Sequence, residues 1–347
     1  MAKRMLITGG CGFIGSNTAS YFLERGYEVD VVDNLSRPGS EANEAYLKST
    51  HADAPLSIHI LDIVSEPEAL TKLVVERGYD VVIHAAAQVA VTTSVLDPML
   101  DFRANALGTL NVLEAVRAGG KKPVFIFTST NKVYGGLEDF EAEDIGKRYA
   151  LTTLPNGVHE KVLLDFHSPY GCSKGAADQY VRDYARIYGI PTFVFRQSCI
   201  FGAHQFGMVD QGWVAYLTMR ALFDKPITIY GDGKQVRDVL YMSDLARAYE
   251  VAIESASKNS GEIFNMGGGP ANTLSLLEFL DFLAPRLGKK LDVSFSDWRP
   301  GDQKVYVSDI SKAQKQLNWT PNVNFEQGFN EMLSWMEANK DLLTKYI

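Results

Sequence analysis

Tyr170 and Lys174 stand four residues apart and carry side chains that together could oxidise an alcohol. In a helix, residues at this spacing lie on one face, so the phenol and the ammonium group would be neighbours. A phenol with a pKa of ~10 is a poor base at neutral pH unless nearby positive charge stabilises its anion, and Lys174 could supply that charge. The chain has 16 tyrosines. A match to this spacing is therefore expected roughly once by chance, and the pair needs support from its surroundings.

A run of three hydroxyl side chains, Thr128, Ser129 and Thr130, ends the apolar strand predicted at residues 124–129. Ligands of parallel α/β sheets bind at the carboxyl ends of the strands, where this run would lie. A hydroxyl group there could hydrogen-bond the reacting oxygen of a substrate and relay its proton to a tyrosinate. The alternative is an ordinary strand end whose hydroxyl groups are satisfied by the protein.

Three regularly spaced glycines, Gly9, Gly12 and Gly15, follow the first predicted strand and open a helix. The first glycine of such a loop permits a tight turn, the second lets the backbone approach a pyrophosphate, and the third allows helix and strand to pack closely. The helix N-terminus also offers free N–H groups to phosphate oxygens. A glycine triplet alone is a weak signal, since ordinary turns also contain one. Between a strand and a helix it predicts a nicotinamide dinucleotide, whose oxidised ring would add positive charge beside Tyr170.

Asp33 ends the second predicted strand, 18 residues after Gly15. A carboxylate at this position can accept hydrogen bonds from the adenosine ribose and would repel a 2'-phosphate. The sequence therefore predicts NAD rather than NADP. Arg37 follows closely and has two interpretations, as a partner for a 2'-phosphate or as a solvated loop charge.

The elements that would position these residues alternate between strands and helices over the first two-thirds of the chain. Several runs are apolar at every position, as strands covered on both faces require. The alternation predicts an α/β fold with a doubly wound parallel sheet of the Rossmann type. Strands are predicted at residues 4–8, 28–33, 57–61, 80–84, 124–129 and 192–196. Helices are predicted at residues 13–25, 66–77, 98–119 and 174–188.

The last third of the chain predicts a smaller, mixed α/β lobe that binds substrate. Its helices are expected at residues 210–223, 243–256, 275–287 and 325–338. We place the cofactor domain at residues 1–197 and the substrate lobe mainly at 198–347, with part of 235–258 returning to the first domain. The polar, irregular stretch 135–167 is long for a connection, and we interpret it as a lid over the site.

The composition argues against several classes of protein. The 347 residues are 46% apolar and 22% charged, as in ordinary globular proteins, and the net charge of -8 argues against general binding to nucleic acid or anionic membranes. No apolar run is long enough for a signal peptide or a membrane span. The three cysteines lack a paired spacing, and the six histidines form no metal-ligand pattern. We therefore expect reduced thiols, a cytoplasmic location and no metal.

Over nearly its full length the chain resembles the extended short-chain dehydrogenase/reductase family. The matching segments, in family order, are the glycine loop, Asp33, Asp62-Ile63, His84-Ala85-Ala86-Ala87, Asn105, Tyr170 with Lys174, Arg237-Asp238 and Arg299-Pro300-Gly301-Asp302. The resemblance implies that Thr130 is the hydroxyl partner of Tyr170. It also implies that Arg237 and Arg299 hold the diphosphate of a sugar nucleotide, for which bidentate charge-assisted hydrogen bonds are well suited.

The resemblance further implies that Asp62 and Ile63 lie beside the adenine of the cofactor and that Asp302 holds the ribose of the substrate. The predicted catalytic residues are Thr130, Tyr170 and Lys174. The residues predicted to bind the cofactor are Gly9, Gly12, Phe13, Ile14, Gly15, Asp33, Asn34, Ser36, Arg37, Asp62, Ile63, Ala85, Ala86, Ala87, Gln88, Asn105, Thr128, Ser129, Tyr170 and Lys174. The residues predicted to bind the substrate are Gln88, Thr130, Asn131, Lys132, Ser198, Gln211, Arg237, Arg299 and Asp302.

Four longer segments narrow the resemblance to the CDP-paratose 2-epimerase (CDP-tyvelose epimerase) group of that family. They are residues 88–94, 128–135, 165–174 and 210–213. This similarity implies NAD-dependent epimerisation of a CDP-hexose at C2 through a transient 2-keto sugar, with NAD retained through the cycle. It also implies a homodimer or homotetramer.

Three other functions stay open. A UDP- or other nucleotide-diphosphate hexose 4-epimerase needs the same catalytic residues, although Ser198 stands where that group usually has asparagine and Val89 where it has lysine. A 4,6-dehydratase needs an added acid–base pair, and Asn131 and Lys132 stand where that group carries Asp-Glu. These two residues either touch the sugar or only shape the loop. A non-catalytic NAD-binding regulator would not need an intact catalytic set.

Overall fold

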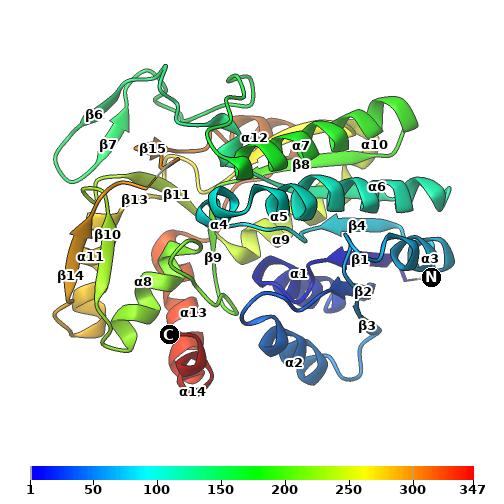
Figure 1. Cartoon of the computed structure of the whole chain (residues 1–347), viewed down its shortest axis with the longest axis horizontal. Coiled ribbons are helices and arrows are strands. Elements are labelled where there is room, and N and C mark those ends of the chain that lie inside the picture. The colour runs from blue at the N-terminus through cyan, green and yellow to red at the C-terminus, as the bar shows by residue number, and fades with distance from the viewer. Residues whose placement is uncertain (1, 300) are drawn as a thin grey trace.

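A seven-stranded parallel sheet forms the centre of the computed structural model, which describes residues 2–299 and 301–347 (Figure 1). Its strands follow the order β12 (Glu262–Met266), β8 (Thr192–Gln197), β5 (Val124–Thr130), β4 (Val81–His84), β1 (Arg4–Thr8), β2 (Glu28–Asp33) and β3 (Leu56–Ile60). Every neighbouring pair is parallel. The strand order reverses beside β1, and ligands of such folds bind at this switch point. The predicted doubly wound sheet is confirmed.

Helices cover both faces of the sheet, because successive side chains of each strand point to opposite sides and both sides are apolar. In β1, Met5 and Ile7 belong to one buried cluster and Leu6 belongs to another. The first cluster includes residues of α1 (Phe13–Leu23), α2 (Ser40–Thr50), α9 (Met242–Glu254) and α12 (Ser311–Leu317). The second includes residues of α3 (Pro67–Arg77), α6 (Gly108–Ala118) and α7 (Pro169–Tyr188). Figure 1 shows α6 and α7 on one side of the sheet and α1 and α2 on the other.

The predicted helix at residues 98–119 is three elements rather than one. The structure has α5 (Pro98–Phe102), a π-helical turn η1 (Arg103–Leu107) and then α6, and the short α4 (Val91–Leu96) precedes them. Asp97 caps α5 by accepting a hydrogen bond from the backbone N–H of Leu100. The helix predicted from residue 174 begins instead at Pro169, because Ser168 caps it and a proline suits the first turn. Both Tyr170 and Lys174 therefore lie within α7.

The chain after residue 197 builds a second lobe and also returns to the central sheet. A small sheet joins β9 (Cys199–Phe201), β11 (Val236–Tyr241), β13 (Thr273–Ser275) and β15 (Val305–Tyr306), and β10 (Ile227–Tyr230) pairs with β14 (Val293–Ser296). The helices of this part are α8 (Trp213–Leu222), α10 (Ala256–Asn259), α11 (Leu276–Leu287), α13 (Phe325–Ala338), α14 (Lys340–Leu343) and the 3-10 turn η3 (Thr344–Tyr346). Besides α9, both β12 and α12 return to the first lobe, and neither was predicted to do so.

The stretch 135–167, interpreted as a lid, contains a packed hairpin. A 3-10 turn η2 (Asn131–Tyr134) leads into it, and β6 (Ala142–Asp144) pairs with β7 (Tyr149–Leu151). Arg148 donates two hydrogen bonds to the Glu278 carboxylate, at 2.7 and 2.5 Å, and Leu151 and Val158 are buried in a local apolar cluster. These contacts tie the hairpin to the smaller lobe.

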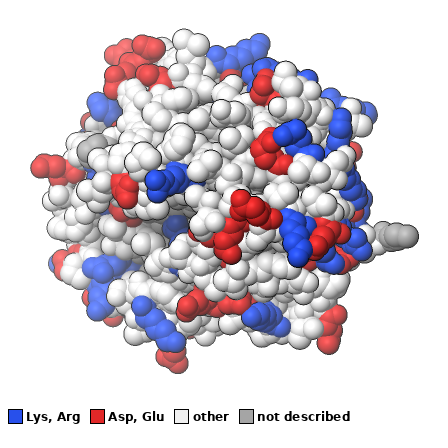
Figure 2. All heavy atoms as spheres, turned by 45° about the vertical axis from the view of Figure 1, so that its right-hand side comes forward, with Lys and Arg blue, Asp and Glu red and all other residues white. Residues whose placement is uncertain are grey.

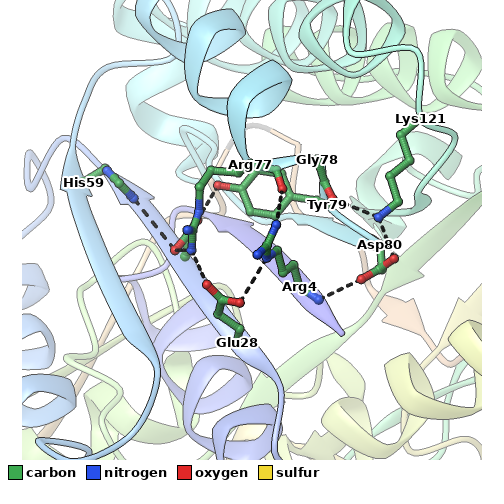
Figure 3. A network of polar contacts seen from close by, with 9 residues as sticks. Arg4, Glu28, His59, Arg77, Gly78, Tyr79, Asp80 and Lys121 are labelled. Atoms are coloured by element: carbon green, nitrogen blue, oxygen red, sulfur yellow. Dashed lines mark hydrogen bonds and ion pairs between the residues drawn. The ribbon is translucent and has the colours of Figure 1, made fainter. Parts of the chain in front are cut away.

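A polar network fastens the amino ends of the strands, at the edge away from the hydroxyl run of β5 (Figure 3). Arg77 donates to the buried carboxylate of Asp30 at 2.7 Å and to Glu28 at 2.6 Å, and Tyr79 donates to Asp30 at 2.6 Å. Arg4 donates to Glu28 at 3.0 Å. Among the residues that the structure describes, no helix is long and apolar enough to cross a membrane.

Candidate active site

A cavity of about 330 Å³ lies at the carboxyl edge of the central sheet, between the sheet and the smaller lobe. The start of α1, the segment after β4, the end of β5 and α7 form its wall on the side of the sheet. The predicted site residues that line it are Phe13, Ile14, Ala85, Ala87, Thr128, Ser129, Thr130, Asn131, Lys132, Tyr170, Lys174, Ser198, Gln211, Arg237, Arg299 and Asp302. The structure thus brings together the predicted catalytic residues and every predicted substrate residue except Gln88.

The glycine loop packs too tightly for side chains at two of its three positions. Gly9 has a positive φ of 67°, and a Cβ there would lie 2.6 Å from the backbone nitrogen of Ala86. A Cβ on Gly15 would lie 2.1 Å from the carbonyl oxygen of Gly9, so this glycine lets α1 approach the strand end. At Gly12 the only near atom would be that same oxygen, at 3.1 Å. Apart from that oxygen, no atom of the described residues beyond its chain neighbours lies within 4 Å of a Cβ on Gly12, so a pyrophosphate can approach its backbone.

Asp33 lies at the carboxyl end of β2 with its carboxylate against the glycine loop. It accepts hydrogen bonds from the backbone N–H groups of Cys11 at 2.9 Å and Leu35 at 2.8 Å. Burial raises the pKa of Asp33 above its ordinary value, and these hydrogen bonds oppose the rise. A carboxylate oxygen can accept more than one hydrogen bond, so Asp33 can still receive the hydroxyl groups of a ribose.

The other residues predicted around the adenosine lie in the loops beside Asp33. Asn34 donates to Asp62 at 2.6 Å, and Ser36 donates to Asn34 at 2.7 Å. Burial opposes ionisation of Asp62, but the hydrogen bond from Asn34 and backbone N–H groups lower its pKa overall. Ile63 is buried in the apolar cluster on the α3 side of the sheet.

Arg37 is not a solvated loop charge in this structure. Its guanidinium hydrogen-bonds the side-chain oxygen of Gln211, which belongs to the smaller lobe. Burial lowers the pKa of Arg37, and the charge of an ionised Tyr170 would oppose that change. Arg37 therefore reaches from the predicted cofactor wall across the cleft toward the predicted catalytic residues.

Tyr170 and Lys174 share the buried face of α7. Burial raises the pKa of Tyr170 to about 12, while a hydrogen bond with Thr130 opposes the rise. Burial lowers the pKa of Lys174 to about 7, and the carboxylates of Asp101 and Asp178 oppose the fall. The ammonium nitrogen lies 4.2 Å from the centre of the Phe127 ring, an arrangement that favours its charged form.

Only one of the three hydroxyl groups at the end of β5 pairs with Tyr170. Thr128 donates to the carbonyl oxygen of His84 at 3.1 Å, and Ser129 donates to Asp178 at 2.9 Å. Thr130 lies beside Tyr170 and lowers its pKa, and its hydroxyl group donates to the amide oxygen of Asn131 at 3.3 Å. The first two hydroxyl groups are thus satisfied by the protein, and the geometry supports the prediction that Thr130 is the partner.

Asn131 and Lys132 are held in different ways. The amide nitrogen of Asn131 donates to the buried Gln303 at 3.2 Å, so this side chain helps to shape the loop. Lys132 donates to the carbonyl oxygen of Gly301 at 3.0 Å. Burial, together with the charge of Arg237, lowers the pKa of Lys132 to about 8. Lys132 and Arg237 therefore make a positive region inside an acidic protein.

Arg299 also lines the cavity and adds a third cation to it. Its guanidinium lies over the ring of Tyr230, 3.6 Å from the ring centre, and 3.2 Å from the carboxylate of Asp210. Asp302 and Ser198 also line the cavity, and Ser198 donates to the backbone carbonyl of Asp238 at 3.0 Å. On the face in Figure 2, by contrast, Lys and Arg side chains are scattered among Asp and Glu side chains. An anionic ligand would therefore meet its positively charged partners, Lys132, Arg237 and Arg299, in the cavity.

Gln88 and Asn105, both predicted to bind the cofactor, lie outside the lining of the cavity. They hydrogen-bond a carboxylate that the sequence did not suggest, that of Asp101, at 2.7 and 3.1 Å. Two other polar residues missed from the sequence are Trp213 and Gln235, which line the cavity. Each has a buried polar atom without a hydrogen-bond partner in the described part of the chain. Trp213 lay at the end of a segment of resemblance, but no sequence signal marked Gln235 or Asp101.

Comparisons with known proteins agree with this geometry. A family profile described as GDP-mannose 4,6 dehydratase matches residues 6–332. The CDP-paratose 2-epimerase of Salmonella typhi is 44% identical over 96% of this chain and 99% of its own. The structure of UDP-glucose 4-epimerase from Thermotoga maritima with UDP-glucose aligns with a TM-score of 0.82 and 29% identity, over 97% of this chain and 99% of its own. The dTDP-glucose 4,6-dehydratase DesIV of Streptomyces venezuelae, with NAD bound, aligns with a TM-score of 0.82 and 28% identity, over 98% of each chain.

The residues present fit a nicotinamide dinucleotide. Gly12 leaves open backbone at the N-terminus of α1, and the Asp33 carboxylate is placed for a ribose. The cavity beyond them runs to Tyr170 and Lys174 at the carboxyl ends of the strands. The family profile covers well over half of the chain. The chain therefore belongs to the GDP-mannose 4,6-dehydratase family, within the extended short-chain dehydrogenases/reductases.

Proposed function

We propose that this protein is an NAD-dependent nucleotide-sugar epimerase that inverts C2 of a CDP-hexose, interconverting CDP-paratose and CDP-tyvelose through a 2-keto sugar. The observation that carries the proposal is the convergence of Thr130, Tyr170 and Lys174 with Arg237 and Arg299 in one cavity. The residues proposed to take the proton and those proposed to bind the diphosphate then face the same nucleotide sugar. The 44% identity to the Salmonella typhi epimerase over nearly the whole chain supports the choice of C2 and of cytosine.

The catalytic residues divide the proton chemistry among them. Tyr170, as its anion, accepts the proton of the sugar hydroxyl group, and Thr130 hydrogen-bonds the same oxygen. Lys174 in its charged form stabilises the tyrosinate, which burial alone would disfavour. When bound, NAD supplies the reversible two-electron oxidation of the sugar carbon. The glycine loop and Asp33 would hold it.

Inversion requires the keto sugar to present its other face while the nucleotide stays in place. Arg237, on β11, and Arg299, after β14, both line the cavity, so both can hold the diphosphate while the sugar turns. Such orientation is a large part of catalysis, because it converts a bimolecular encounter into a step within one complex. The general-base step itself contributes about 10²–10⁴-fold.

The residues after Thr130 disfavour elimination of water. Dehydratases of this fold carry Asp-Glu at the positions of Asn131 and Lys132. Here the first is an amide tied to Gln303 and the second an amine tied to Gly301. Neither is a carboxyl group that could act as the added acid or base. The intact catalytic set likewise argues against a non-catalytic regulator.

A 4-epimerase is the second candidate, because it needs the same catalytic residues and the Thermotoga maritima structure superposes over nearly the whole chain. Product analysis separates the two functions. We expect purified protein incubated with CDP-paratose, CDP-glucose, UDP-glucose and UDP-galactose to give a C2 epimer from a CDP-hexose by NMR. A C4 epimer from UDP-glucose with no change in either CDP-hexose would overturn the proposal. The Tyr170→Phe variant is the blank in each reaction.

A homodimer or homotetramer is part of the proposal. Large apolar side chains are exposed on adjoining helices, namely Leu96 on α4, Met99 and Phe102 on α5, and Tyr180 on α7. Contiguous apolar surface of this kind commonly marks an interface between proteins. Light scattering should give a molecular mass that is a multiple of the chain mass of 38.4 kDa. The Phe102→Asp substitution should reduce the measured mass. The cytoplasmic location remains a prediction from the unpaired thiols.

A further inference from the structure

Asp101 is a fully buried carboxylate that joins the predicted cofactor wall to the catalytic helix. It lies on α5, where its neighbours Met99, Leu100 and Phe102 are exposed and Asp101 itself is not. Gln88, from the segment after β4, donates to it at 2.7 Å. From α7, Ser173 also donates to it. Through Asp101, the loop before α4 and the helix that carries Tyr170 and Lys174 share one hydrogen-bond network.

The network favours Asp101 as an anion. Gln88 and Asn105 present amide N–H groups to one carboxylate oxygen, and Ser173 presents its hydroxyl group to the other. Amide nitrogens donate and do not accept, so a proton on the carboxyl group could be accepted only by Ser173, which would then donate its own proton to the backbone carbonyl of Tyr170 at 3.2 Å. Burial raises the pKa of Asp101, and the hydrogen bonds from Ser173 and Gln88 oppose that rise.

The charge of Asp101 faces the catalytic pair. The groups around Lys174 are Asp101 from α5, Tyr170 and Asp178 from α7, and His84 from β4. The groups around Tyr170 are Asp101, Thr130 from β5 and Arg37 from the loop after β2.

These neighbours are not equivalent. Asp178 is already paired with the buried Arg196, at 2.8 and 3.0 Å. Burial keeps His84 neutral. Among the described residues, Asp101 has no Arg or Lys within ion-pair distance, so its charge acts on Lys174 uncompensated.

We propose that Asp101 is a positioning residue of the epimerase, whose negative charge holds Lys174 in its protonated form while its hydrogen bonds fix α7 against the cofactor wall. The inference rests on the proposed function, because it gives Lys174 a task that requires the charged form. Without this carboxylate, burial would favour the neutral amine, and a neutral amine cannot stabilise a tyrosinate.

The proposal predicts the direction of a pH shift. Removing the negative charge lowers the pKa of Lys174. Because the amine of Lys174 is already neutral at the pH where Tyr170 ionises, the loss of Asp101 acts on Tyr170 only through its own charge, and it lowers the pKa of Tyr170 as well. The rate profile should therefore move as a whole toward acid by about one pH unit, the low end of the shift that a nearby charge causes. A role confined to packing would lower the rate without moving the profile.

The experiment compares pH profiles of kcat for the holoenzyme and its Asp101→Asn, Asp101→Glu and Ser173→Ala variants. Asp101→Asn should displace both limbs toward acid, whereas the other two keep the charge and should keep the limbs in place. Unmoved limbs in Asp101→Asn would overturn the proposal. If Asp101→Asn does not fold, Asp101→Ser takes its place with the same expectation. If both neutral variants fail to fold while Asp101→Glu folds, the charge serves the fold, and the proposal is also wrong.

A second measurement needs no substrate. Tyrosinate absorbs in the ultraviolet, and the absorbance of each variant is compared with that of the same variant carrying Tyr170→Phe, with NAD present. The difference between the two reports the ionisation of Tyr170. Asp101→Asn should lower the midpoint of that difference, and an unchanged midpoint counts against the proposal. If this midpoint shifts but no nucleotide sugar is epimerised, the proposed function fails while the charge coupling stands.

Discussion

The carboxylate of Asp210 lies 3.2 Å from the guanidinium of Arg299, the cation that we assign to the diphosphate of the substrate. Asp210 also accepts a hydrogen bond from Thr92 of α4. The carboxylate of Asp210 thus contacts the same guanidinium group that a phosphate of the substrate would need. Substrate binding on Arg299 must therefore displace this carboxylate or share the guanidinium with it.

Replacing Asp210 with asparagine removes this competing anion. We expect Asp210→Asn to tighten CDP binding by up to about fivefold, because ion pairs near the surface contribute about 0.2–1 kcal/mol. Calorimetric titration with CDP measures the effect, and Asp183→Asn, an exposed carboxylate on α7, controls for the change in net charge. Weaker binding in Asp210→Asn would show instead that Asp210 holds Arg299 in its working position.

Removing the phenol hydroxyl group of Tyr170 separates catalysis from cofactor binding. Tyr170→Phe should lower kcat by at least about a hundredfold, because the general base is lost. The bound NAD should stay, since the glycine loop and Asp33 are untouched. NAD released on denaturation is quantified beside turnover, with Tyr188→Phe, a half-exposed tyrosine of the same helix, as the control. Equal turnover in the two variants would exclude Tyr170 as the base.

Substituting two glycines of the loop should affect different properties of the protein. Gly15→Ala places a Cβ 2.1 Å from the carbonyl oxygen of Gly9, so we expect it to destabilise the protein by about 1–3 kcal/mol even without NAD. Gly12→Ala meets that oxygen at 3.1 Å and should lose mainly NAD affinity. Denaturant unfolding without NAD, followed by NAD titration, distinguishes the two effects. Equal destabilisation by both substitutions would contradict the assignment of separate roles.

His84 should make stability depend on pH. Thr109 uses its own proton on the carbonyl oxygen of Asn105 and so accepts from His84, whose other ring nitrogen pairs with Thr8 at 2.6 Å. This network suits the neutral ring, and burial lowers the pKa of His84 from 6.5 to about 3.

Between these two pKa values the unfolded chain binds a proton that the folded chain does not, so stability falls as the pH falls. From pH 7.5 to 5 the loss from His84 is about 2 kcal/mol, which His84→Gln should remove. The free energy of unfolding in urea at the two pH values measures it, with His159→Gln, an exposed histidine, as the control. An identical pH slope in wild type and His84→Gln would show that His84 titrates alike in both states.

The cofactor half of the site was predictable because its signals are local. Gly9, Gly15 and Asp33 act through the backbone of one strand–helix–strand unit, and each lies where its spacing placed it. The strands of that unit also match, because a strand buried on both faces is apolar at every position.

The parts that were missed depend on contacts between distant segments. Asp101 is buried on a helix whose apolar neighbours are exposed, which inverts the pattern that periodicity relies on. Arg37 meets Gln211 across 174 residues of sequence. The strand β12 was missed because its partner, β8, precedes it by a whole lobe. No local pattern records such pairings.

The pairing of β8 with β12 decides how the polypeptide can be divided. A fragment ending at residue 197 would leave β8, buried at every position in the intact chain, as a bare sheet edge. Such an edge, with Phe193 and Phe195 on it, invites pairing with another copy of itself. During synthesis, the edge of β8 emerges from the ribosome before β12 does. The nascent chain is therefore exposed to aggregation until Glu262–Met266 has been synthesised and has paired with β8. The two lobes are therefore poorly suited to being swapped between related proteins. A chimaera that joins lobes of two proteins at residue 197 must take β12 from the same parent as β8.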